Sequence, residues 1–95
     1  MNYKETLDKA REMKIDTFTL MVAEECEQYF RFDYTPDEFE MLCEVVRECY
    51  RKSDYIEVGD IARTITDFIE EEGETIKSVL SMDKWTIIAK ASYYA

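Results

Sequence analysis

Apolar residues recur at helical spacing along most of the chain, and the clearest example follows Thr35. There the apolar face of a predicted helix over residues 36–52 comprises Phe39, Leu42, Cys43, Val46, Cys49 and Tyr50. Its start is marked by Thr35 as the N-cap, Pro36 at the first helical position and Glu38, which can close a capping box. This segment is therefore predicted to be a helix with a defined beginning.

The same periodicity predicts a helix on either side of that segment. One covers residues 17–32, with Asp16 as its N-cap and an apolar stripe at Phe18, Val22, Cys26 and Tyr29. Another covers residues 60–72, with Gly73 as the residue that ends it and an inward face at Ile61, Ile65, Phe68 and Ile69. Shorter helices are predicted over residues 3–14 and around residues 76–80.

The last segment, residues 85–94, is ambiguous. Trp85, Ile88 and Ser92 fit one face of a helix, whereas residues 86–88 and the pair Tyr93 and Tyr94 have strand propensity. We predict a helix because no partner strand is evident and because Ser81 or Asp83 could cap it.

Two glycines and one proline in 95 residues are too few for a turn-rich β-fold. The chain is long enough for one hydrophobic core and too short for a second. The sequence therefore predicts an all-α fold: one acidic domain over residues 1–95, a compact bundle of five to six short helices.

Composition excludes several kinds of chemistry. The chain has no histidine, which removes His-based acid–base catalysis, Cys-His and Ser-His nucleophiles and most zinc sites. No glycine-rich phosphate loop and no calcium-binding loop is present. We therefore expect no enzyme activity, no catalytic residues, no metal and no cofactor.

Three cysteines occur, at positions 26, 43 and 49, in a chain with no signal-peptide pattern and no apolar run long enough for a membrane span. An odd number of cysteines does not suggest a disulfide framework. We expect a cytoplasmic protein without membrane contact, whose thiols act as small core residues.

Charge is the outlying property. The chain has 22 acidic and 12 basic residues, for a net charge of −10. Residues 54–74 alone carry eight carboxylates against Arg63, a net −7, whereas residues 1–15 carry +1 and residues 75–95 carry +2. The negative charge is therefore regional.

The carboxylates lie at helical spacing in two rows, opposite the predicted core faces. The first row comprises Glu57, Asp60, Asp67, Glu71 and Glu74, and the second comprises Asp37, Glu40, Glu44 and Glu48. We expect a partner to contact Asp60, Asp67, Glu70, Glu71 and Glu74, with Asp37, Glu40 and Glu44 as a second set. Like charges one helical turn apart are slightly destabilising, so stability alone does not favour such rows. They are either solvated faces, of which the second can be partly neutralised by Arg47, Arg51 and Lys52, or a recognition surface.

Carboxylate rows on a rigid helical frame resemble nucleic-acid phosphates in sign and spacing. They could occupy the basic groove of a nucleic-acid-binding protein or nuclease. Anti-CRISPR and anti-restriction inhibitors that act as nucleic-acid mimics are analogues of this mode. We expect a basic protein partner and no direct nucleic-acid binding, because the helix–turn–helix outline around Gly73 would turn three acidic residues, 70–72, toward phosphate.

Aromatic residues supply an alternative function. Residues 29–34 hold four aromatics and an arginine, and we expect Phe32 and Tyr34 to be the exposed pair and to contribute to partner binding. Of Tyr93 and Tyr94, one ring is expected to close the bundle and the other to be exposed. These residues could make the protein a self-associating helical module, so a homo-oligomer is also possible.

Overall fold

The structure, a computed structural model, describes Glu12 and residues 16–95, so the helix predicted over residues 3–14 lies outside the described residues. Its longest helix, α3 (Pro36–Lys52), begins and ends where the sequence predicts. Thr35 Oγ1 accepts a hydrogen bond from the Glu38 N–H (3.2 Å), and the Glu38 carboxylate accepts one from the Thr35 N–H (2.9 Å). This capping box satisfies two backbone donors at the start of the helix.

The preceding helix, α2 (Thr17–Tyr29), also begins as predicted but ends three residues early. The Asp16 carboxylate accepts a hydrogen bond from the Phe18 N–H (3.2 Å), so Asp16 is the N-cap. Phe30 leaves the helix in an extended conformation, and its ring packs on that of Phe32 at 5.1 Å. Aromatic packing in the connection thus replaces the last helical turn.

The third helix along the described chain, α4 (Val58–Glu70), is shifted two residues toward the N-terminus of its predicted range. Glu57 precedes it without a side-chain cap, and the buried Val58 is its first residue, so core packing rather than capping begins this helix. Gly73 has a φ of 74°, the left-handed conformation expected of it, three residues after the helix ends.

Two short helices complete the described part: α5 (Ile76–Ser81) and α6 (Lys84–Ala91). The Asp83 carboxylate accepts a hydrogen bond from the Trp85 N–H (3.3 Å), so Asp83, and not Ser81, caps α6. The helical prediction for this segment is confirmed, and Trp85 lies on its exposed side, with 56% of its surface accessible. The buried face comprises Ile87, Ile88 and Ala91.

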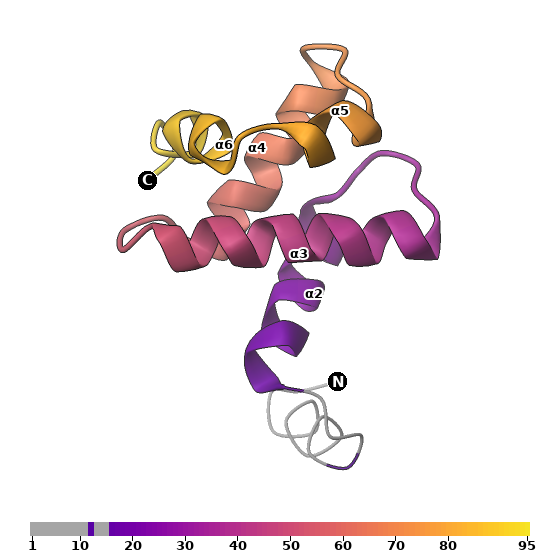
Figure 1. Cartoon of the computed structure of the whole chain (residues 1–95). Helices are drawn as coiled ribbons and strands as arrows, with labels where there is room; N and C mark the ends of the chain where they lie inside the picture. Colours follow the sequence, from indigo (N-terminus) through magenta and orange to yellow (C-terminus); the bar gives the residue numbers. More distant parts are fainter. Residues whose placement is uncertain (1–11, 13–15) are drawn as a thin grey trace.

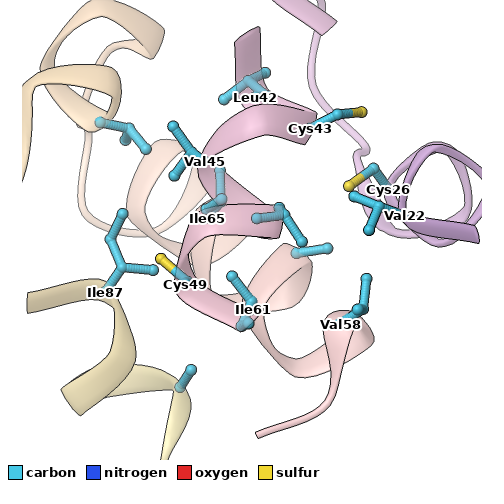
Figure 2. Close-up of a cluster of buried hydrophobic side chains, with 14 of the residues drawn as sticks. Val22, Cys26, Leu42, Cys43, Val45, Cys49, Val58, Ile61, Ile65 and Ile87 are labelled. Carbon is cyan, nitrogen blue, oxygen red and sulfur yellow. The ribbon is translucent and has the colours of Figure 1, made fainter. Parts of the chain in front are cut away.

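The helix α4 is central, because it packs against α2, α3, α5 and α6. Figure 1 shows α4 crossing behind α3, with α2 on one side of α3 and α5 and α6 on the other. The core lies where these helices meet, and it includes the fully buried Val46. Figure 2 shows Leu42, Ile61, Ile65 and Ile87, which are also fully buried there. All three cysteines are buried there, as the sequence predicts.

The all-α compact bundle is confirmed: residues 16–95 form five helices and no strand. No helix in the described part of the chain combines the length and the apolar character that crossing a membrane requires.

Candidate protein-binding surface

The first acidic row follows the narrow exposed strip of α4. Seven of the helix's thirteen residues are buried, which leaves Arg63 and Glu70 exposed and Asp60 and Asp67 partly exposed. Glu71 is exposed at the residue where the helix ends. Because α4 is enclosed by four other helices, its carboxylates cannot spread over a broad helical face and are confined to this strip.

Asp67 is held by the C-terminal turn. The Tyr94 hydroxyl donates a hydrogen bond to the Asp67 carboxylate, and the Arg63 guanidinium lies 4.4 Å from the centre of the Tyr94 ring. The hydrogen bond to Asp67 raises the pKa of Tyr94, because it favours the protonated phenol. Tyr93, by contrast, is 88% exposed. We expected one of these rings to close the bundle, but both are exposed, and Tyr94, at 36%, only contacts Asp67 and Arg63 at the surface.

The C-terminal end of α4 concentrates negative charge where a helix tolerates it least. Exposed carboxylates occupy three successive positions, Glu70, Glu71 and Glu72, at the negative end of the helix dipole, and the last turn contains no basic residue. Lys90 Nζ pairs with Glu72 Oε2 at 2.6 Å and also lies 4.4 Å from the Phe68 ring centre. Among the described residues, no cation pairs with Glu70 or Glu71.

Glu74 has a structural partner. Its carboxylate accepts a hydrogen bond from the Ser78 hydroxyl at 2.6 Å, and it is only partly exposed. Ser78 is also bonded to Thr75 at the start of α5. Glu74 therefore supports the connection from α4 to α5, and its charge is less available to a partner than the charges of Glu70 and Glu71.

The second row lies on α3, where Asp37, Glu40 and Glu44 are all exposed. Glu44 pairs with Arg47, and Glu48 pairs with Lys52 at 3.4 Å, as the sequence predicts for neutralisation within this helix. Arg51 instead lies over the Phe18 ring, 5.5 Å from its centre. Asp37 is in the first turn of α3, where the helix dipole favours a carboxylate. Most of this row thus has a structural explanation.

Phe32 and Tyr34 are not the exposed anchors that the sequence predicts. Both are half-buried in an aromatic cluster with Phe30 and Phe39, in which the ring centres of Tyr34 and Phe39 are 5.2 Å apart. The cluster lies at the connection between α2 and α3 and packs against the core. These rings are occupied by internal packing, which a sequence pattern could not distinguish from an interface.

A cleft at the start of α4 was not predicted. It has a volume of about 390 Å3 and three carboxylates in its lining, from Glu25 on α2 and from Glu57 and Asp60. The remaining lining residues are Met21, Tyr29, Tyr50, Val58 and Gly59. Glu25 reaches this cleft only because α2 packs on α4, and no spacing within the sequence shows which α2 carboxylate faces Asp60.

Basic side chains gather on another surface. Arg47, Arg51, Lys52 and Lys84 line a groove of about 540 Å3 between α3 and the α5–α6 segment. The Lys84 ammonium donates hydrogen bonds to the carbonyls of Leu80 and Met82, each at 3.1 Å. These cations therefore largely interact with groups of the protein itself. None of the four lies on the exposed strip of α4, which stays strongly negative.

The comparisons with known proteins add no assignment. No protein-family model matches the chain, and neither the curated proteins nor the solved structures searched contain a match. Within the described residues, no group of three or more Cys, Asp and Glu side chains is arranged to hold a metal ion.

Proposed function

We propose that this protein is a non-enzymatic, cytoplasmic binding protein that uses its acidic surface to occupy a basic, nucleic-acid-binding surface of a partner protein. The observation that carries the proposal is the exposed pair Glu70 and Glu71 at the negative end of α4, with no described cation beside them. The helix dipole and like-charge repulsion both disfavour carboxylates there. A role in partner binding would explain why the chain carries two carboxylates at this unfavourable position.

The contacts of the other carboxylates decide which of them belong to the proposed binding surface. Glu70 and Glu71 form its centre, Asp60 extends it to the acidic cleft with Glu25 and Glu57, and Asp67 lies between. Glu74 and the α3 row, Asp37, Glu40 and Glu44, contribute general negative potential. Such a potential steers a basic partner and accelerates association.

The partner class follows from the sign and rigidity of the surface. Carboxylates fixed on a helix present negative charges at set positions, as the phosphates of a nucleic acid do. A nuclease or other protein with a basic nucleic-acid channel is the complementary partner. Inhibition then results from competition for that channel, the mode of nucleic-acid-mimic inhibitors of the anti-CRISPR and anti-restriction type.

Competition with nucleic acid tests this proposal. The immobilised protein is incubated with a lysate of its natural host, and bound proteins are eluted with duplex DNA or with RNA. We expect a basic nucleic-acid-binding protein to be displaced by one of these polymers and to be lost from the Glu70→Gln/Glu71→Gln variant. The control Glu24→Gln/Glu27→Gln removes the same charge from exposed positions on α2 and should retain the partner.

Two results contradict the proposal. One is a captured protein that nucleic acid does not displace. The other is equal loss of the partner from both double variants, because it would make net charge, and not the α4 surface, the cause of binding.

Self-association is the alternative, and Tyr93 is the residue that favours it. This ring is 88% exposed, and Tyr55 and Trp85 are also exposed. Apolar contacts persist when salt is raised, whereas contacts between opposite charges weaken. Sedimentation equilibrium at low and high salt distinguishes the two functions: a mass near 11.3 kDa at both excludes the self-associating module, and a salt-resistant dimer supports it.

A further inference from the structure

The contact between α2 and α3 contains two buried cysteines. Cys26 on α2 has no exposed surface, and Cys43 on α3 is 9% exposed. Figure 2 shows both sulfur atoms in the space between the two helices, at the edge of the core. Each of the two thiols shifts the pKa of the other, so the two sulfur groups lie close together. Two thiols that lie close together across a helix contact are the arrangement from which a disulfide can form.

The two thiols differ in exposure and in the direction of their pKa shifts. The interaction with Cys43, burial and the nearby Glu25 all raise the pKa of Cys26, so this thiol keeps its proton. The interaction with Cys26 lowers the pKa of Cys43, although burial and the carboxylates of Glu44 and Glu40 oppose that effect. Cys43 is also the more accessible of the two. It is therefore the sulfur that an oxidant meets first, with Cys26 placed beside it.

We propose that Cys26 and Cys43 are a redox pair that peroxide converts into a disulfide tying α2 to α3. In the first step the Cys43 thiolate attacks one oxygen of hydrogen peroxide, the O–O bond breaks, and the departing hydroxide takes up a proton to become water. Cys43 is then a sulfenic acid.

In the second step the Cys26 sulfur attacks the Cys43 sulfur. The S–S bond forms, the S–O bond breaks, and the hydroxyl leaves as a second water with the proton from Cys26. Overall, the two thiols lose two electrons and two protons, and the peroxide is reduced to two waters. A small thiol such as glutathione reverses the change by thiol–disulfide exchange.

The third cysteine provides an internal comparison. Cys49 is also buried on α3, but its thiol points to the Lys84 carbonyl, 3.8 Å away, and not to another sulfur. Burial raises the pKa of Cys49 to about 11. We therefore expect Cys49 to remain a thiol when the pair is oxidised. The inference concerns the α2–α3 contact alone and does not depend on the proposed binding function.

Peptide mapping of the full chain tests the pair directly, because trypsin places each cysteine in a different peptide. Cleavage after Lys14, Arg31, Arg47 and Arg51 gives peptides 15–31, 32–47 and 48–51. The folded protein is treated with hydrogen peroxide, its free thiols are alkylated, and the digest is analysed without reduction. We expect 15–31 joined to 32–47, two hydrogens lighter than their sum, and 48–51 alkylated. Methionine oxidation adds oxygen but makes no cross-link.

Variants confirm the order of events. Cys49→Ala should form the same cross-link as the unsubstituted protein. Cys26→Ala should stop at the Cys43 sulfenic acid, which dimedone traps, and circular dichroism checks that this variant remains helical. The cross-linked protein should unfold ~10 °C higher than the reduced protein, and dithiothreitol should abolish that shift.

The proposal is overturned if Cys26 stays alkylatable while Cys43 is oxidised to the sulfinic acid. It is also overturned if the only cross-links join two chains. Neither outcome requires a variant to fold, because both are read from the unsubstituted protein.

Discussion

The hydroxyl group of one buried threonine links two helices in this core. The Thr66 hydroxyl donates to the carbonyls of Tyr29 and Ala62, both at 3.0 Å, and so ties the end of α2 to α4. Thr64, two residues earlier, is also buried, but its hydroxyl donates only to the Asp60 carbonyl of its own helix, at 2.9 Å. The two threonines look alike in sequence and differ only in what packs against them.

We therefore expect Thr66→Val to lower the free energy of unfolding by about 1–2 kcal/mol, because the partly buried Tyr29 carbonyl loses a hydrogen-bond donor. Thr64→Val is the matched control and should cost less, since it severs no link between helices. Urea denaturation measures both values. A loss at Thr64 as large as that at Thr66 would contradict this role.

Cys49 provides a pH prediction. Burial raises the pKa of its thiol from the ordinary 9.0 to about 11, so the folded state favours the protonated form. The contribution of the protonated Cys49 thiol to the free energy of unfolding is complete below pH 9 and is lost as the pH rises through about 11. We expect the stability of the protein to fall over that interval, and to fall less in Cys49→Ala. Denaturant titrations at pH 8 and above test it, and parallel pH profiles would contradict it.

At the scale of helices, sequence predicted the starts better than the ends. Asp16 and Thr35 are local signals, because each caps a helix through atoms two or three residues away. The end of α2 and the start of α4 depend on tertiary packing around Phe30 and Val58, which no local pattern records. The buried face of α6 depends on the same kind of information, because the packing of α6 against α3 and α4 decides it.

The capping box of α3 should therefore be a local source of stability. We expect Thr35→Ala to lower the free energy of unfolding by about 1 kcal/mol, because the Glu38 N–H loses its acceptor. Thr35→Ser, which retains the hydroxyl, should cost much less. Thermal or urea unfolding compares the two. Equal losses would mean that the methyl group, and not the hydrogen bond, stabilises the helix.

At the scale of the whole molecule, the sequence predicted the amount and the region of negative charge. It did not predict which carboxylates are free to contact a partner. Spacing placed Asp67 and Glu74 in the candidate surface without showing that Tyr94 and Ser78 bind them. It also could not show the cleft with Glu25, because contacts between helices decide which carboxylates meet. Among the described residues, no cation pairs with Glu70 or Glu71, so these two remain as the exposed pair available to a partner.

These two carboxylates should be unfavourable for stability. We expect Glu70→Gln/Glu71→Gln to raise the free energy of unfolding by a few tenths of a kcal/mol per residue, roughly the size of a charge–dipole interaction at an exposed helix end. Added salt should stabilise the unsubstituted protein more than the variant, since it screens the repulsion that the variant has lost. Thermal unfolding across a salt series measures both effects. A less stable variant would assign these residues a structural role.

The most direct test of the proposed function is the salt dependence of the Kd for the partner obtained by nucleic-acid elution. The unsubstituted protein, Glu70→Gln/Glu71→Gln and Glu24→Gln/Glu27→Gln are compared by calorimetry at several salt concentrations. We predict that affinity falls as salt rises, and that only the α4 variant binds more weakly and with a shallower salt dependence. Unchanged affinity and salt dependence in the α4 variant would contradict the assignment of this surface.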